Sequence, residues 1–276
     1  MSKPSTEGVP VRSAPVESSP ASPELSLTGK AVVVTGASSG IGRATALACA
    51  QAGADVAVTY STNLAGAKDT AEQIRALGRR TEVLRADVTD SAAITALASS
   101  ARATLGRVDV WINNAGADIL TDTAAQLTWT EKLDRLLSVD LRGTVLASWA
   151  AVDLMRAQGP GGVILNMAWD HVAAGGMTGE YAQVFCAAKG GVYSFSRALA
   201  RTVAPHIRVN VLAPGWVETA YGAALDPAAK KRITEAIPLR RWARPDEIAA
   251  AAVFLACDAA GYITGQMLMV NGGDVI

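Results

Sequence analysis

The chain has 276 residues, 50% of them hydrophobic, and its 25 acidic and 25 basic side chains give a formal net charge of zero. This length and apolar content are ample for one large core but short for two full domains. The balanced charge removes the electrostatic case for nucleic acid or an anionic membrane surface as a partner, so we expect a small-molecule ligand.

Residues 1–24 differ from the rest of the chain, because Pro4, Pro10, Pro15, Pro20 and Pro23 stand among serines with almost no large apolar side chains. Such a segment buries too little surface to order itself, and it lacks the basic start and apolar centre of a secretory signal. We therefore expect a disordered tail, followed by one domain over residues 25–276.

Short apolar runs then alternate with amphipathic stretches that are long enough to cross over a sheet. The runs cover residues 31–35, 55–60, 82–85, 108–112, 163–167, 208–212 and 267–270. Continuous apolar runs of this kind are typical of parallel strands that are buried on both faces. The pattern predicts a single doubly wound α/β domain, with a parallel sheet of about seven strands and helices on both faces.

The first predicted strand runs into a glycine turn, Gly36-Ala37-Ser38-Ser39-Gly40-Ile41-Gly42, and then into an Ala-rich helix. Residues without a Cβ let the backbone approach a pyrophosphate, whose charge the free N–H groups at the helix start can stabilise. The alternative is a tight strand-to-helix turn without a ligand, since a lone glycine cluster is weak support for a nucleotide site.

Other residue types suggest neither a metal nor an oxidising compartment. The cysteines Cys49, Cys186 and Cys257 are far apart in Ala-rich stretches, which suits reduced thiols in a core, and His171 and His206 show no metal-ligand spacing. No apolar run approaches the ~20 residues needed to span a bilayer. We therefore expect a soluble, cytoplasmic protein without a metal site.

Five segments occur in the order found in the short-chain dehydrogenase/reductase family, which has a Rossmann fold, and the resemblance covers residues 25–276. Thr35-Gly36-x-x-x-Gly40-Ile41-Gly42 resembles its nucleotide-binding signature, and Asp87-Val88 resembles its adenine contact. Asn113-Asn114-Ala115-Gly116 resembles a strand end, and Pro214-Gly215-Trp216-Val217-Glu218-Thr219 resembles the loop beside the nicotinamide. Residues 263–273 resemble the C-terminal closure.

The resemblance implies a nicotinamide cofactor and a homotetramer or homodimer. The cofactor-binding residues that it implies are Gly36, Ser38, Ser39, Gly40, Ile41, Gly42, Asp87, Val88, Asn114, Ala115, Gly116, Lys189, Pro214, Gly215, Val217 and Thr219. An acidic residue at the end of the second strand would select NAD(H), but this chain has Thr59-Tyr60-Ser61 there, with Arg43 after the glycine turn. We therefore expect NADP(H) with Ser61 near the ribose; alternatively, Ser61 begins a loop and both cofactors are accepted.

The catalytic positions depart from the family pattern. Members of that family use a Ser and a Tyr to bind and protonate a carbonyl, a Lys to lower the tyrosine pKa and hold the ribose, and an Asn to anchor a water relay. Lys189 is kept, but Phe185 stands at the tyrosine position and Asp140 at the asparagine position. If Asp140 lies near Lys189, an ion pair between them holds the lysine protonated.

No serine occurs between Asn166 and Phe185, and Ala168-Trp169-Asp170-His171 follows the fifth predicted strand. Asp170 is the positional stand-in for the family serine, at a strand end that faces the nicotinamide in a doubly wound fold. The alternative is that Asp170 caps a loop and His171 lies on the surface, since Asp is common in turns.

A hydride donor without a phenol suits an iminium substrate, because hydride addition to this cation gives a neutral amine and needs no acid. We therefore predict an NADP(H)-dependent imine reductase with Asp170, Lys189, Asp140 and Trp169 as catalytic residues, in which carboxylates and an indole ring stabilise the cation. One alternative is a ketone reductase that uses Tyr181, His171 or a protonated Asp170 as acid. Another is a protein that binds the cofactor without redox turnover, such as a cyclase.

Overall fold

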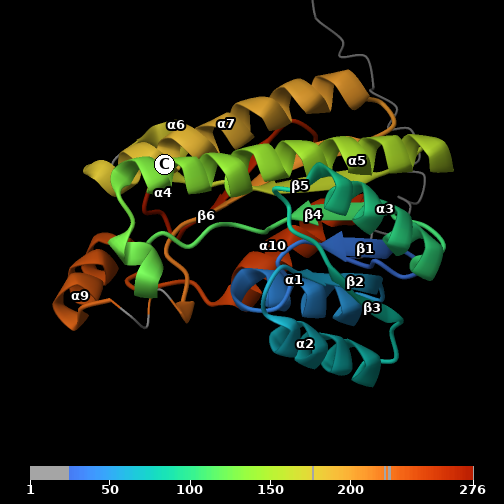
Figure 1. The fold of residues 1–276 in the computed structure, drawn as a ribbon, viewed down its shortest axis with the longest axis horizontal. Helices are drawn as coiled ribbons and strands as arrows, with labels where there is room; N and C mark the ends of the chain where they lie inside the picture. The colour runs from blue at the N-terminus through green and yellow to red at the C-terminus, as the bar shows by residue number, and fades with distance from the viewer. Residues whose placement is uncertain (1–24, 176, 221, 223–224, 276) are drawn as a thin grey trace, which may run out of the picture.

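A parallel sheet of seven strands forms the centre of the molecule, in the order β3-β2-β1-β4-β5-β6-β7 (Figure 1). The computed structural model describes residues 25–175, 177–220, 222 and 225–275. The strands are β1 (Ala31–Val34), β2 (Asp55–Tyr60), β3 (Thr81–Arg85), β4 (Val110–Asn113), β5 (Val163–Met167), β6 (Arg208–Pro214) and β7 (Met267–Val270). The predicted doubly wound sheet is therefore confirmed, whereas the predicted tail lies outside the described residues.

Alternate residues of the central strands face two separate apolar layers. Val32 and Val34 pack in one core with α1 (Gly40–Gln51), α2 (Leu64–Ala76) and α10 (Pro245–Ala256). Val33 and Trp111 pack in the other core with α3 (Ser91–Leu105), α5 (Gly143–Gln158) and α7 (Glu180–Val203). Figure 1 shows these two helix layers on opposite faces of the sheet. Burial on both faces explains why β1 and β4 are wholly apolar or buried along their length.

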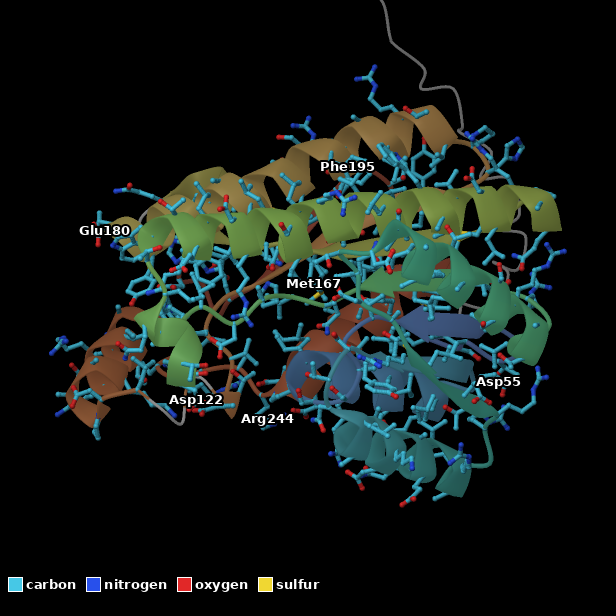
Figure 2. All side chains as sticks on the ribbon, viewed as in Figure 1. Asp55, Asp122, Met167, Glu180, Phe195 and Arg244 are labelled. Carbon is cyan, nitrogen blue, oxygen red and sulfur yellow. The ribbon has the colours of Figure 1, made fainter. Side chains whose placement is uncertain are left out.

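The shorter elements gather at the end of the molecule where the strands finish. They are the 3₁₀ turn η1 (Asp122–Gln126), α4 (Trp129–Leu136), the π-helix η2 (Leu137–Arg142), α6 (His171–Ala174) and α9 (Pro227–Ala236). The 3₁₀ turn η3 (Asp258–Ala260) precedes β7. Figure 2 shows Asp122, Glu180 and Arg244 at this end, while Asp55, at the start of β2, lies toward the other. The carboxyl ends of the strands are therefore where this fold offers a ligand site.

A buried polar network fixes the ends of β4 and β5 against the helices. Asn113 Nδ2 donates to Asn166 Oδ1 at 2.8 Å, and Asn166 Nδ2 donates to Ser196 Oγ on α7 at 2.9 Å. Trp111 Nε1 donates to Asn113 Oδ1 at 2.9 Å. Because both amides are nearly inaccessible and fully engaged, this network holds the strand ends that carry the site in one arrangement.

Within the described residues, no helix is both long and apolar enough to cross a membrane.

Candidate active site

A cavity of about 360 Å³ lies at the carboxyl ends of β5 and β6. Aromatic rings form much of its wall, and these belong to Trp169, Tyr181, Phe185, Trp216 and Trp242. Five residues of the predicted cofactor site also line it: Ile41, Lys189, Gly215, Val217 and Thr219. Among its described lining residues, the only ionisable amine or guanidinium is Lys189. The cavity is thus an apolar pocket next to the expected nicotinamide position.

The glycine turn has the room and the free N–H groups that a pyrophosphate needs. A Cβ on Gly42 would lie 2.2 Å from the backbone oxygen of Gly36, and Gly36 has φ +65° with Ala115 Cα 3.0 Å from its own ideal Cβ. Ser39 begins α1 without a side-chain cap, and the first turn of α1 carries no acidic residue. An uncapped helix start behind close-packed glycines fits the diphosphate of a dinucleotide.

The end of β4 is held against this turn by Asn114. Its Nδ2 donates to the backbone oxygens of Thr35 at 3.0 Å and Gly36 at 3.2 Å, and its backbone N–H donates to Thr35 Oγ1 at 2.9 Å. The strand order reverses between β1 and β4, and a dinucleotide binds at such a crevice. The sequence-predicted residues 114–116 therefore do lie beside the glycine turn.

The structure adds one cation to the predicted ribose site. Arg85, at the end of β3, donates from Nε to the backbone oxygen of the exposed Ser61 at 3.3 Å. Arg43, the cation suggested by the sequence, forms an ion pair with Asp69 at 2.5 Å. Arg85 was missed because it lies in a different strand; its register opposite Tyr60 brings it to the end of β2.

At the predicted adenine contact, the side chain of Asp87 already makes hydrogen bonds within the chain. The carboxylate of Asp87 accepts hydrogen bonds from the backbone N–H and the hydroxyl of Thr89, at 2.9 Å and 2.8 Å. Val88 packs against Gly143, where an added Cβ would lie 2.7 Å from Val88 Cγ2. This close approach places the start of α5 directly behind the expected adenine position.

Lys189 and Asp140 form an ion pair, which the sequence predicted on the condition that the two residues lie close together. Lys189 Nζ lies 2.8 Å from Asp140 Oδ2, and their side chains are 12% and 3% exposed. Asp140 Oδ1 accepts from the backbone N–H of Ala117 at 2.8 Å, while Lys189 Nζ also donates to the backbone oxygen of Met167 at 3.2 Å. Asp140 lies in the π-helix η2, a type of local distortion that is frequent at functional sites. The lysine is thus paired and fixed at the pocket wall.

Phe185 lies on α7 four residues before Lys189, and its ring lines the pocket. It lies 6.0 Å from the ring of Trp169, centroid to centroid. Trp169 in turn lies 4.6 Å from the ring of His171. The wall at Phe185 is therefore aromatic and offers no hydroxyl group.

The predicted placement of Asp170 on the pocket wall is wrong. Asp170 is 0% exposed, and its two oxygens accept hydrogen bonds from the backbone N–H of His171 at 3.0 Å and from Asn271 Nδ2 at 3.1 Å. A Cβ on Gly215 would lie 3.1 Å from Asp170 Oδ2, so the carboxylate lies behind the pocket wall at Gly215. The backbone of Asp170 lies near the site because the residue follows β5. Its side chain, however, points toward the C-terminal segment.

The environment of Asp170 disfavours its charge. Burial raises the pKa of the Asp170 carboxyl, and the neighbouring Asp274 raises it further, while the hydrogen bonds from Asn271 and His171 lower it. His171 is buried, with 7% of its surface exposed, so the alternative that placed it on the surface is also wrong. The alternative reading of Asp170 as a local cap agrees with its bond to the backbone of His171 at the start of α6.

Tyr181, on α7, and Trp242, in the loop before α10, complete the pocket. Tyr181, 45% exposed at the start of α7, packs edge-on against Trp129 with 4.9 Å between ring centroids. The ring of Trp242 lies 5.1 Å from that of Trp216 and is almost fully buried. Tyr181 is therefore the one phenol among the described lining residues.

Comparison with known proteins agrees with this geometry. The family model described as Enoyl-(Acyl carrier protein) reductase matches residues 36–274. The chain is 37% identical over 250 residues to an L-rhamnose 1-dehydrogenase (NAD(P)(+)) of Sphingomonas sp., covering 90% of this chain and 96% of that protein. It is also 37% identical over 251 residues to a 3-oxoacyl-[acyl-carrier-protein] reductase of Salmonella typhimurium, covering 90% of this chain and 98% of the other.

Solved structures show the same fold over nearly the same span. A putative short-chain alcohol dehydrogenase from Sinorhizobium meliloti superposes with a TM-score of 0.82 at 37% identity, covering 91% of this chain and 98% of the other. A short chain dehydrogenase from Burkholderia cenocepacia, solved in complex with NADP, superposes with a TM-score of 0.81 at 30% identity. That match covers 90% of this chain and 98% of the Burkholderia chain.

Proposed function

This chain belongs to the short-chain dehydrogenase/reductase family of oxidoreductases, and we propose that it uses NADP(H) to reduce the C=N bond of a small iminium substrate. The observation that carries the proposal is Phe185, which lines the pocket beside Lys189 where a carbonyl reductase of this family needs its phenol. NADPH, when bound, supplies a hydride. The residues of the chain must then stabilise the acceptor and exclude water.

The chemical argument concerns the charge that develops during reduction. A ketone that accepts hydride becomes an alkoxide, which needs a proton donor or an oxyanion stabiliser. An iminium carbon that accepts hydride forms a C–H bond while the C=N π electrons become the nitrogen lone pair, so a neutral amine results without proton transfer. A pocket whose former phenol position is a phenyl ring therefore suits the iminium better.

Aromatic faces supply the stabilisation that the sequence had assigned to Asp170. The rings of Trp169, Phe185, Trp216 and Trp242 line the same cavity as Lys189. An organic cation over such rings gains about 0.5–2 kcal/mol from each well-placed face once it is desolvated. The Asp140–Lys189 pair is neutral overall, so the lysine does not repel a cationic substrate as a free ammonium would.

In this proposal Lys189 binds the cofactor, and Asp140 holds Lys189 in position. The ammonium is held by Asp140 and the Met167 carbonyl, and it would donate to the nicotinamide ribose at the pocket wall. Trp169 contacts the substrate, whereas Asp170 is a positioning residue that holds the loop carrying Trp169. For the cofactor, the exposed Arg85 beside Ser61 supports NADP(H), because a guanidinium pairs well with a 2′-phosphate.

A second candidate keeps ketone reduction and uses Tyr181 as the acid. The observation that favours it is that Tyr181 lines the pocket one helical turn before Phe185. The relatives reported above also act on alcohols or oxo groups, according to their names. This candidate requires the Tyr181 hydroxyl for turnover, whereas the iminium proposal does not.

The test is NADPH oxidation with a cyclic imine and with the ketone of the same carbon skeleton. We expect turnover of the imine at pH values where it is protonated, and kcat/KM that changes less than about 3-fold in Tyr181→Phe. Phe185→Leu keeps the apolar volume but removes the ring, and should lower imine kcat/KM by about 5-fold or more, as loss of ~1 kcal/mol of cation–π stabilisation requires.

Two outcomes contradict the proposal. Ketone turnover that exceeds imine turnover and disappears in Tyr181→Phe would establish the second candidate. If NADPH binds but neither compound is reduced, the protein binds the cofactor without redox turnover on these substrate classes, and both reductase candidates are lost.

A further inference from the structure

Asp170, His171 and Asp274 bring three ligand-type side chains together behind the pocket wall. One nitrogen or carboxylate oxygen from each lies within 4.8 Å of the others. His171 Nε2 is 3.6 Å from Asp274 Oδ2 and 3.9 Å from Asp170 Oδ1. The side chains of Asp170, His171 and Asp274 are only 0%, 7% and 13% exposed.

The histidine is oriented with its unprotonated side toward the carboxylates. His171 Nδ1 lies 2.7 Å from the backbone oxygen of Gly175. A carbonyl oxygen can only accept, so Nδ1 carries the hydrogen, and in a neutral imidazole Nε2 then presents a lone pair. Within the described chain, Nε2 makes no hydrogen bond, since both carboxylates are more than 3.5 Å away. The Nε2 lone pair thus faces the two carboxylates.

No lysine or arginine in the described part of the chain pairs with the carboxylates of Asp170 and Asp274. Among the described residues, the only group that forms an ion pair with Asp170 or Asp274 is His171 itself. Asn271 Nδ2 donates to Asp170 Oδ2 at 3.1 Å and orients that carboxylate without neutralising it. Two carboxylates and one imidazole lone pair are the ligand set of a dication.

We propose that Asp170, His171 and Asp274 bind a divalent transition-metal ion of the Zn²⁺ type. An imidazole ligand favours such an ion over Mg²⁺ or Ca²⁺, which prefer oxygen donors throughout. Ligand atoms about 2.0–2.1 Å from a tetrahedral zinc are about 3.4 Å apart, close to the two distances from His171 Nε2. The hydrogen bond from Nδ1 to Gly175 is the support that metal-bound histidines usually have.

The ion would join two segments that are far apart in the chain. Asp170 and His171 follow β5 and are adjacent to Trp169 of the pocket wall, whereas Asp274 follows β7. Bound metal would therefore fix the Trp169 loop to the C-terminal segment. The sequence predicted no metal site because His171 and His206 show no metal-ligand spacing, and Asp274 comes from the far end of the chain.

The test is calorimetric titration of Zn²⁺ into tag-free full-length protein pretreated with a chelator, together with thermal unfolding. We expect one Zn²⁺ per chain and a rise in Tm of about 5 °C or more at Zn²⁺ concentrations 100-fold above Kd. Co²⁺ in place of Zn²⁺ should give visible absorption bands from a low-symmetry N,O site.

His171→Asn is the informative variant, because the asparagine amide can still donate to the Gly175 carbonyl while Nε2 is removed. It should weaken Zn²⁺ binding at least 10-fold, as should Asp274→Asn. His206→Asn is the matched control, since this second histidine is exposed and outside the cluster. It should bind Zn²⁺ as the unchanged protein does.

Equal Zn²⁺ affinity in the His171→Asn variant and the unchanged protein would overturn the proposal, because the metal would then bind elsewhere. Absence of binding up to 1 mM-scale concentrations, about where Kd corresponds to only ~4 kcal/mol, would overturn it too. Both measurements report binding and stability, so their outcome is independent of the substrate proposed above.

Discussion

The ion pair between Lys189 and Asp140 should be the most costly single contact to break at the pocket. Asp140→Asn keeps the shape of the side chain and replaces its carboxylate with a neutral amide. The Asn Oδ1 can still accept from the Ala117 N–H, which now donates to Asp140 at 2.8 Å. The substitution therefore removes the charge and the acceptor of Lys189 Nζ, while it keeps the hydrogen bond from Ala117.

The distance and burial of the pair set the expected magnitude. Two charges 2.8 Å apart interact by about 6 kcal/mol at an effective dielectric constant of about 20. Breaking a buried pair typically costs 3–5 kcal/mol, because one charge stays buried without its partner. Water in the pocket can reach Lys189, whose side chain is 12% exposed. We therefore expect a loss of about 2–3 kcal/mol of unfolding free energy and a fall in Tm of about 5–10 °C.

Urea unfolding of Asp140→Asn, Lys189→Met and the double variant measures the coupling. The double variant should be less destabilised than the sum of the single variants by about 2 kcal/mol, because it leaves no unpaired charge. Asp153→Asn, an exposed change on α5, is the control and should stay within about 0.5 kcal/mol of the unchanged protein. Additivity of the two pocket variants to within ~0.5 kcal/mol would refute the reasoning.

Two further predictions concern the glycine turn of the cofactor site and the first turn of α10. Gly42→Ala, whose Cβ would meet the Gly36 oxygen at 2.2 Å, should lower stability by about 1–3 kcal/mol and weaken NADPH binding measured by fluorescence. Gly190→Ala meets nothing within 4 Å and should be neutral or stabilising; equal losses in both variants would contradict this. Glu247→Gln should lower Tm at pH 7, because hydrogen bonds and charge from Arg241 lower the pKa of Glu247 from 4.5 to about 2. That stability is present above pH 4.5 and is lost as the pH falls to about 2, so the Tm difference should close over this range in a pH series.

The strands were predictable because burial on both faces leaves a direct mark on the sequence. The run at residues 31–35 lies on β1, and its alternate valines enter the two cores. The boundary at β4 was less predictable: Val108 is buried like its neighbours, but its N–H donates to Gln158 Oε1 rather than to a strand. Apolar residues report burial, whereas a strand is defined by its hydrogen bonds.

At the site, the sequence likewise indicates where a residue lies better than where its side chain points. Lys189 and Asp140 lie on helical segments whose geometry fixes where side chains point, and they meet in the ion pair that the sequence expected if the two lay close together. Asp170 follows a strand in a loop, where spacing sets the backbone but not the side chain. Its direction depends on Asn271 and Asp274, which come from the far end of the chain. Contacts of that kind are not encoded in any local pattern.

Phe185 and Asp140 together set the electrostatic environment of Lys189. A phenyl ring offers no oxygen to a lysine, so an ammonium that is mostly buried must find its partners elsewhere. Asp140 Oδ2 at 2.8 Å and the Met167 carbonyl at 3.2 Å provide them. The charge of Lys189 is thereby neutralised within the wall, and the rest of the described lining is uncharged and rich in aromatic rings. A carbonyl that enters this pocket meets no proton donor at Phe185. A cationic substrate meets no unpaired ammonium there, and its reduction needs no proton donor.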